Sequence, residues 1–245
     1  MVFDEILKYT ERKQKMFTVL IDPDKYDDNK LLDLSKLANQ SHVHCFFVGG
    51  SLMTSNRHKK TIEILKSTTD IPVVIFPGSN LQVDSGADAI LFLSLISGRN
   101  PEFLIGQHVV AAPYIKKTGL EVLPTGYMLI EGERQTTANY MSNTLPIPKD
   151  KAEIAVCTAM AGEMLGLKMI YLDGGSGAER NIPIEMVHQV KENIGVPLIV
   201  GGGITSAEQA HQIWENGADM IVVGNAIESN LDLIHQISSE LKSVI

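Results

Sequence analysis

Residues 169–177 read MIYLDGGSG, residues 196–204 read VPLIVGGGI and residues 220–225 read MIVVGN. Each stretch is a short apolar run that ends directly in glycine. The runs are continuously apolar instead of alternating with polar residues, which is typical of parallel strands buried on both faces. Glycine at the carboxyl end of such a strand indicates a tight turn into the next helix. The three stretches therefore predict three successive βα units of an α/β protein.

The same pattern extends over the whole chain, where short apolar runs alternate with segments of helical periodicity. We predict strands at Phe17–Asp22, Cys45–Gly50, Val73–Pro77, Ala89–Ser94, Tyr127–Ile130, Met169–Asp173, Leu198–Gly201 and Met220–Gly224. We predict helices at Leu31–Asn39, Lys59–Ser67, Ile184–Asn193, Ala207–Glu215 and Leu231–Lys242. Eight parallel strands with right-handed crossovers close into a barrel more readily than they form an open sheet. Because the chain has 245 residues, we expect one domain over residues 1–245, a (β/α)8 TIM barrel.

Two connections depart from a regular barrel. Only Ser79–Asp88 remain between the third and fourth strands, whereas a full crossover usually needs about a dozen residues or more. We therefore expect a thinned outer helix layer between these strands, with an apolar groove against the barrel wall. The connection Glu131–Pro148 is long and polar, which is typical of a lid or a disordered segment.

The composition restricts the function and the location of the protein. The formal net charge of −8 gives no electrostatic support for binding nucleic acid or an anionic membrane surface. Cys45 and Cys157 lie in apolar runs without metal-ligand spacing, which suits a reducing cytoplasm. The sequence begins without the apolar stretch of a signal peptide, and no run approaches the roughly 18 apolar residues of a membrane span. We expect a cytoplasmic protein with no integral membrane segment.

Glycine-rich loops follow the last three predicted strands, at Tyr171–Ala178, Gly201–Ser206 and Gly224–Ala226. Glycine lets backbone N–H groups approach and surround an anion without interference from a Cβ atom. The helices that follow add positive potential at their amino termini, and Ser206 is a candidate N-cap beside the site. A tight βα turn explains any one of these loops, but three in succession favour a phosphate site between the last two strand ends.

The first predicted strand ends in Asp22-Pro23-Asp24-Lys25, and the second ends in Gly49-Gly50-Ser51. A carboxylate after a buried strand is costly unless it binds a cation or hydrogen-bond donors. An Asp-Pro turn explains Asp24 as well as any functional role does. Asp22 and Ser51 lie at adjacent strand ends in a closed barrel, where they offer hard oxygen ligands to Mg²⁺.

Six strand-end motifs follow one another in order: Ile21-Asp22-Pro23-Asp24-Lys25, Val48-Gly49-Gly50-Ser51, Phe76-Pro77-Gly78-Ser79, Tyr171-Leu172-Asp173-Gly174-Gly175-Ser176-Gly177-Ala178, Gly201-Gly202-Gly203-Ile204 and Val223-Gly224-Asn225. Together they resemble the geranylgeranylglyceryl phosphate synthases, including the related bacterial heptaprenylglyceryl phosphate synthases. Each motif alone is of modest specificity. Six motifs in register, spread over nearly the whole chain, make the resemblance specific.

The resemblance implies Mg²⁺-dependent transfer of a geranylgeranyl or other prenyl group from a prenyl diphosphate to the 3-hydroxyl of sn-glycerol 1-phosphate. Diphosphate leaves, and the product is an ether-linked lipid precursor whose release implies a transient membrane contact. The resemblance also implies that Asp22 and Ser51 hold the metal. The glycerol phosphate would lie on Tyr171, Leu172, Asp173, Gly174, Gly175, Ser176, Gly177, Gly202, Gly203, Gly224 and Asn225.

Two further residues fit this chemistry. Mg²⁺ and Lys25 can neutralise the charge on the departing diphosphate. The acceptor hydroxyl needs a base as the C–O bond forms, and Asp173 is the carboxylate nearest the phosphate loops. The resemblance implies glutamate at position 173. Aspartate is one methylene shorter, so Asp173 either abstracts the proton from a repositioned acceptor or acts through a bridging water.

Two alternative functions remain open from the sequence. A sugar-phosphate isomerase or epimerase of the same barrel group would use Asp22 and Glu131 as an acid–base pair. That pair explains neither Ser51 nor the thinned helix layer. A non-catalytic barrel that binds phosphorylated ligands or serves as an assembly subunit is the second alternative, although the strand-end carboxylates argue against it.

The segment Ala152–Leu165 is apolar on nearly every side. A barrel helix needs only one apolar stripe to cover its strands. We therefore predict that the other face of this helix is buried in a homodimer or a larger homo-oligomer. Lysine at Ala155 or Ala159 is expected to disrupt that contact.

Overall fold

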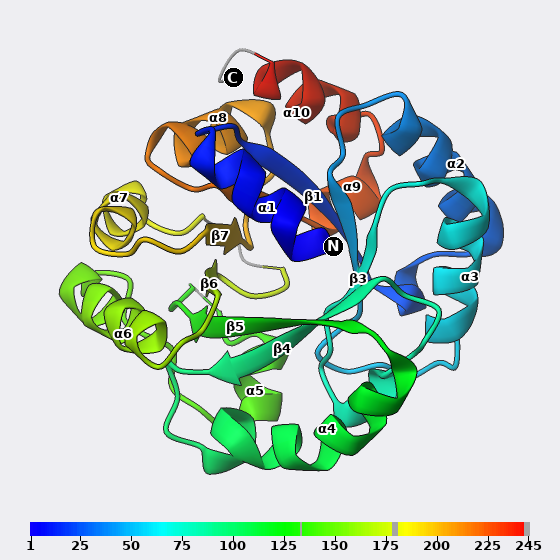
Figure 1. Ribbon diagram of the computed structural model, residues 1–245. Helices are drawn as coiled ribbons and strands as arrows, with labels where there is room; N and C mark the ends of the chain where they lie inside the picture. Colours follow the sequence, from blue (N-terminus) through cyan, green and yellow to red (C-terminus); the bar gives the residue numbers. More distant parts are fainter. Residues whose placement is uncertain (133, 178–180, 243–245) are drawn as a thin grey trace.

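Eight parallel strands form a closed barrel in the computed structural model, which describes residues 1–132, 134–177 and 181–242 (Figure 1). The strands are β1 (Met16–Ile21), β2 (Cys45–Val48), β3 (Val73–Ile75), β4 (Ala89–Leu95), β5 (Glu121–Leu129), β6 (Met169–Asp173), β7 (Leu198–Gly201) and β8 (Met220–Val223). Each strand pairs with its neighbour in sequence, and β8 closes the barrel on β1 with Phe17 opposite Ile221. The predicted α/β class and (β/α)8 barrel are confirmed.

The helices surround the barrel and cover its outer wall (Figure 1). They are α2 (Asp28–Asn39), α3 (His58–Thr68), α4 (Gln107–Thr118), α6 (Ala152–Met164), α7 (Ile184–Glu192), α8 (Ala207–Glu215) and α10 (Leu233–Leu241). Two short helices, α5 (Thr137–Ser142) and α9 (Asn225–Ser229), lie in loops that follow β5 and β8. The outer side chains of the strands pack on the helices in one large buried cluster that includes Trp214, Ile170 and Val187.

A second buried cluster fills the inside of the barrel. It contains Phe47, Val74 and Tyr171 from the strands, together with Ile6 of the amino-terminal helix α1 (Val2–Glu11). The Glu121 carboxylate at the start of β5 accepts hydrogen bonds from the amides of Val2 (2.6 Å) and Phe3 (3.0 Å). Because these amides belong to the first turn of α1, Glu121 caps that helix against the amino-terminal end of the barrel. The opposite end, at the carboxyl ends of the strands, remains accessible to ligands.

The thinned helix layer is confirmed. Between β3 and β4 the chain forms only a 3₁₀ turn at Asn80–Gln82. The Leu81 side chain of this turn is 91% exposed, so it does not cover the barrel wall. The outer face of β4 therefore lacks the helix that a regular crossover would supply.

The predicted boundaries of strand five and the missing fourth helix need correction. Strand β5 begins at Glu121, six residues before the predicted start at Tyr127. Its early part contains Pro124 and Gly126, which are weak strand formers, yet it pairs with β4 over seven residues. Helix α4 was not predicted because it contains Pro113 and follows a π-helical turn at Glu102–Gly106, and both features interrupt the helical period.

Candidate active site at the carboxyl ends of the strands

One pocket connects the loops that follow β1, β2, β6, β7 and β8, and extends to the outer face of β4. It is lined by most of the site residues predicted from the sequence: Asp22, Ser51, Tyr171, Asp173, Gly175, Ser176, Gly177, Gly202, Gly203, Gly224 and Asn225. Three predicted residues do not line it. The Leu172 side chain is fully buried in the cluster between strands and helices, Gly174 lies behind the lining with its amide bonded to Gly201 O, and Lys25 is exposed beyond the lining residues.

The end of the pocket that is formed by the β6, β7 and β8 loops presents backbone donors. Within the described residues, no hydrogen bond takes up the N–H groups of Gly177, Gly203 and Asn225. Ser176 Oγ donates to Asn225 Oδ1 (3.2 Å) and so joins the β6 and β8 loops. Ser206 caps α8 as predicted, since its hydroxyl accepts a bond from the Gln209 amide (3.2 Å). Unpaired donors from three loops and a capped helix terminus form a favourable site for an anion.

Gly202 lies in close contact with the β6 loop at this end of the pocket. Its φ of +85° lies in the left-handed region. A Cβ atom there would stand 2.8 Å from the Gly174 nitrogen and 2.9 Å from the Gly175 nitrogen. Glycine at position 202 therefore allows the β7 loop to lie directly against the β6 loop.

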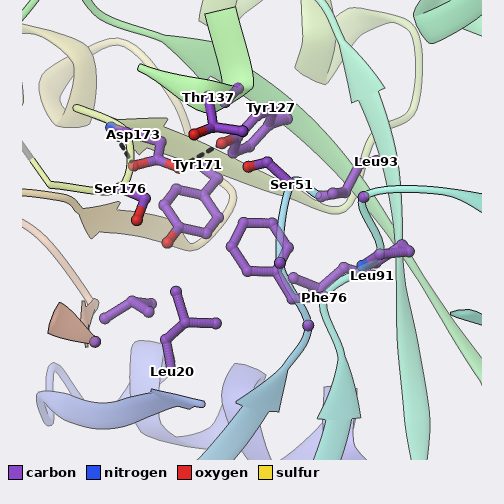
Figure 2. A pocket seen from close by; sticks show the side chains of 18 of the residues that line it. Leu20, Ser51, Phe76, Leu91, Leu93, Tyr127, Thr137, Tyr171, Asp173 and Ser176 are labelled. Carbon is purple, nitrogen blue, oxygen red and sulfur yellow. Dashed lines mark hydrogen bonds between the residues drawn. The ribbon is translucent and has the colours of Figure 1, made fainter. Parts of the chain in front are cut away.

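Asp173 lies at the end of β6 with its side chain 7% exposed. Its carboxylate accepts a short hydrogen bond from the Tyr127 hydroxyl and another from the Gly175 amide (2.7 Å), as Figure 2 shows. Burial raises the pKa of Asp173, and these two hydrogen bonds offset only part of that rise. A carboxylate with a raised pKa beside an anion site is suited to accepting a proton.

Sequence reasoning missed Tyr127. Its ring stands edge-on to Tyr171 (5.4 Å between centroids) and close to Phe76 (5.8 Å), and Phe76 stacks on Tyr171 (5.5 Å) (Figure 2). Tyr127 pairs directly with Tyr171 in the β5–β6 register, so that both rings face the inside of the barrel. The register of neighbouring strands is the signal that would have placed Tyr127 beside Asp173.

Asp22 follows β1 and caps the 3₁₀ turn Pro23–Lys25, since its carboxylate accepts a bond from the Asp24 amide (3.0 Å). Burial raises the pKa of Asp22. The hydrogen bond from the Asp24 amide opposes this rise, and the negative charge of Asp24 adds to it. A Cβ on Gly50 would lie 3.4 Å from the Asp22 carboxylate, which places the β2 loop, with Ser51, against Asp22.

Asp24 has a different role. Its carboxylate accepts four hydrogen bonds, from the amides and hydroxyls of Thr54 and Ser55. Burial opposes these bonds, but together they lower the pKa of Asp24. Asp24 therefore holds the β2 loop in place. This agrees with the interpretation of Asp24 as part of an Asp-Pro turn instead of a functional residue.

Asp22 and Ser51 fit a magnesium ion by the chemistry of their oxygens. Mg²⁺ is usually held by one or two carboxylates, and takes its remaining ligands from water and substrate phosphates. Within residues 1–132, 134–177 and 181–242, no three His, Cys, Asp or Glu side chains are grouped so as to hold a metal ion by themselves. An ion at Asp22 and Ser51 would thus depend on the phosphate oxygens of a bound substrate.

An apolar groove continues the pocket along the unprotected face of β4. Its walls are Ile90 and Phe92 of β4 and His108, Ala111 and Ile115 of α4. The connection predicted as a lid or a disordered segment contains α5, which contributes Thr137, Ala138, Met141 and Ser142 to the lining. The mostly apolar lining of the groove suits a hydrocarbon ligand beside the barrel.

The sequence matches the PcrB family over residues 8–241. The chain belongs to the PcrB family. A relative from Spirosoma linguale, named geranylgeranylglyceryl phosphate synthase, is 51% identical over 94% of this chain and 92% of its own length. One from Methanosphaera stadtmanae with the same name is 37% identical over the full length of both. These relatives confirm the predicted resemblance of this PcrB family member.

Solved structures agree with the sequence matches. A structure of (S)-3-O-geranylgeranylglyceryl phosphate synthase from Thermoplasma acidophilum, in complex with sn-glycerol-1-phosphate, superposes with a TM-score of 0.93 at 31% identity and covers 99% of both chains. An N-acetylmannosamine-6-phosphate 2-epimerase from Clostridium perfringens superposes with a TM-score of 0.56 at 12% identity. The second likeness shows that this PcrB family member shares the barrel fold with the epimerase, and nothing more.

Proposed function

We propose that this protein transfers a prenyl group from a prenyl diphosphate to the 3-hydroxyl of sn-glycerol 1-phosphate. The observation that carries the proposal is the continuity of one pocket. It joins a backbone anion site at the β6–β8 loops, the oxygens of Asp22 and Ser51, and an apolar groove against β4. The names of the relatives, and the sn-glycerol-1-phosphate in the Thermoplasma acidophilum structure, support this assignment.

In the proposed reaction the 3-hydroxyl oxygen forms a bond to C1 of the prenyl group while the bond from C1 to the diphosphate oxygen breaks. The diphosphate leaves with the bonding electrons, and the hydroxyl proton passes to Asp173. Each Asp173 oxygen accepts one protein hydrogen bond, so each retains a lone pair for the acceptor. Asp22 and Ser51 would hold Mg²⁺, which when bound would supply positive charge to stabilise the leaving diphosphate. Lys25 does not line the pocket, but its charge acts on Asp22 and Glu228, and we propose that it adds to the positive potential at this end.

Asp22 and Glu131, the acid–base pair of the isomerase alternative, do not both line the pocket. Glu131 is exposed and does not line the pocket, whereas Asp22 does. The proposal of a non-catalytic barrel does not explain why a buried carboxylate with a raised pKa lies beside the anion site. The transferase accounts for both carboxylates and for the groove.

The direct test is incubation of the protein with sn-glycerol 1-phosphate, Mg²⁺ and labelled prenyl diphosphates of several lengths, followed by extraction of lipid phosphate. We expect an organic-soluble product that requires Mg²⁺ and the 1-phosphate enantiomer. A folded protein that gives no such product with any prenyl diphosphate contradicts the proposal.

Substitution of Gly202 tests the phosphate end. Gly202→Ala forces a Cβ against the Gly174 and Gly175 amides and adds a left-handed penalty of about 1–2 kcal/mol. We expect the KM for sn-glycerol 1-phosphate to rise about tenfold or more, measured by steady-state kinetics. Gly166→Ala is the matched control, because Gly166 has a similar φ of +89° with no atom within 4 Å of the added Cβ. An equal effect of both variants would show that backbone strain alone is responsible.

The predicted assembly contact remains a proposal, and its residues need correction. Ala155 and Ala159 are fully buried against the protein's own barrel, so the face that carries them is the inner face of α6. The outward face carries Ile154 (44% exposed), Cys157 and Met164 (80% exposed). We propose that this outward face is buried between copies of the chain, each copy being one domain over residues 1–245.

Lysine at Met164 is expected to dissociate this oligomer while the fold remains intact, because it introduces a charge on an apolar contact. Ala159→Lys is expected to unfold the chain instead. Light scattering and thermal melting distinguish the two results. A wild-type protein that is monomeric at micromolar concentration contradicts the proposed contact.

The proposal also includes where the protein is located and how it contacts a membrane. Within the part of the chain that the structure describes, no helix is both long and apolar enough to cross a membrane. Cys45 and Cys157 are free thiols, and on that basis we propose a reducing, cytoplasmic location. A transient membrane contact at product release follows from the chemistry of the proposed lipid product.

A further inference from the structure

Glu228 is a pocket carboxylate that the sequence motifs do not include. It belongs to α9, which follows β8, and its side chain lines the same pocket as Asp22 and Ser51. Strand β8 pairs with β1, with Val223 opposite Val19, so α9 and the Asp22 loop are neighbours at the carboxyl end of the barrel. Glu228 thus faces the pocket from the β8 side, and Asp22 faces it from the β1 side.

The backbone of Glu228 is held in place, whereas its carboxylate feels the charges of Lys25 and Lys30 without a hydrogen bond or ion pair to either. Lys30 Nζ donates to the Glu228 backbone oxygen (2.7 Å) and lies 4.9 Å from the centre of the Tyr26 ring, which ties α9 to the start of α2. Within the described ranges 1–132, 134–177 and 181–242, no hydrogen bond or ion pair occupies the Glu228 carboxylate oxygens. By contrast, the Asp24 carboxylate is saturated by Thr54 and Ser55. Glu228 and Asp22 therefore keep oxygens available to a ligand.

Asp22 and Glu228 line the same pocket from neighbouring elements, and their negative charges disfavour a diphosphate there, although the charges of Lys25 and Lys30 act on Glu228 in the opposite sense. The two carboxylates repel each other, and both repel the diphosphate. A divalent cation bound to both carboxylates makes diphosphate binding favourable, because the cation attracts the carboxylates and the diphosphate alike. Two carboxylates with substrate oxygens and water form a donor set that Mg²⁺ commonly accepts.

We propose that Glu228 is a second carboxylate ligand of the divalent cation, together with Asp22, and so helps to bind the metal-loaded diphosphate. This inference rests on the proposed function, because it assigns a further residue to the diphosphate end of that same site. Glu228 is a binding residue in this scheme, and it exchanges no proton with the substrates.

The test measures binding of inorganic pyrophosphate to the purified protein by calorimetry, with and without Mg²⁺. With Mg²⁺, Glu228→Gln is expected to weaken pyrophosphate binding about tenfold or more, because the cation loses a charged ligand. Without Mg²⁺, the same variant is expected to bind pyrophosphate a few-fold more tightly (about threefold), since one repelling charge is gone. Glu11→Gln, at an exposed position on α1 at the opposite end of the barrel, is the matched control and should change neither value.

The opposite signs of the two effects separate a metal ligand from a structural role, since a damaged fold weakens binding under both conditions. Glu228→Asp keeps the charge on a shorter side chain, and we expect it to restore part of the Mg²⁺-dependent affinity. Unchanged Mg²⁺-dependent binding in Glu228→Gln overturns the inference.

The variant Asp22→Asn, measured in the same assay, distinguishes a wrong role for Glu228 from a wrong proposed function. If Asp22→Asn weakens binding and Glu228→Gln does not, Glu228 alone is excluded. If wild-type protein and both variants bind pyrophosphate equally with and without Mg²⁺, the metal-dependent site itself is wrong.

Discussion

Replacing Asp22 with asparagine is expected to lower kcat by about 10³-fold, because it removes a proposed ligand of a metal ion, and a bound metal ion can contribute several kcal/mol to stabilising a leaving diphosphate. Asparagine has nearly the same shape and still accepts the Asp24 amide bond that caps the 3₁₀ turn. The fold of the β1 loop should therefore persist. Affinity for sn-glycerol 1-phosphate should remain near that of the wild type, since the proposed phosphate site is formed by backbone N–H groups of the β6–β8 loops and not by Asp22. Steady-state kinetics and calorimetry with sn-glycerol 1-phosphate give the two values.

Asp24→Asn is the control for this experiment. Asp24 is two residues away and carries the same charge, but its oxygens are occupied by Thr54 and Ser55. Its replacement should loosen the β2 loop without removing a metal ligand, so that the Mg²⁺ concentration required for half-maximal activity changes little. An equal loss of sn-glycerol 1-phosphate affinity in Asp22→Asn would mean that the two substrates do not occupy separate parts of the pocket.

The barrel could be predicted because its signal is local. Each strand of a parallel barrel is buried on both faces, and so it reads as a continuous apolar run such as Leu198–Gly201. The glycine-rich loops could also be predicted, since Gly202 must be glycine to lie against the β6 loop. Features that depend on partners distant in sequence could not be predicted. Strand β5 extends back to Glu121 because a long β4 pairs with it, and no property of residues 121–126 reveals that partner.

The pocket residues that the sequence did not predict depend on how strands distant in sequence pair with each other. Tyr127 lies beside Asp173 because the two strands pair in one particular register. Glu228 lines the same pocket as Asp22 only because β8 closes on β1, although these strands lie at opposite ends of the sequence. The α6 helix shows the same limitation: it is apolar all round, so its periodicity does not tell which side meets the barrel, and Ala155 and Ala159 were placed on the wrong face.

Replacing Asp173 with asparagine is expected to lower kcat by about 10²–10⁴-fold, the usual contribution of a general base, while KM for sn-glycerol 1-phosphate changes much less. Asparagine retains an oxygen for the Gly175 amide but cannot take up the hydroxyl proton. The wild-type enzyme should lose kcat as the pH falls through the pKa of Asp173, because the base must be ionised. Burial raises that pKa, so the loss should begin at a higher pH than for an ordinary aspartate. A pH profile of kcat measures both effects.

Tyr127→Phe tests the cause of this acidic limb. The Tyr127 hydroxyl donates to the Asp173 carboxylate and lowers its pKa against the stronger effect of burial. Without that donor the ionised form of Asp173 loses a hydrogen bond, so its pKa rises further and the acidic limb should move to higher pH. At a pH well above the limb, Tyr127→Phe should keep much of its kcat, whereas Asp173→Asn should stay impaired at every pH. If Asp173→Asn instead turns over nearly as fast as the wild type, the proton goes elsewhere, and an oxygen of the departing diphosphate is then the base.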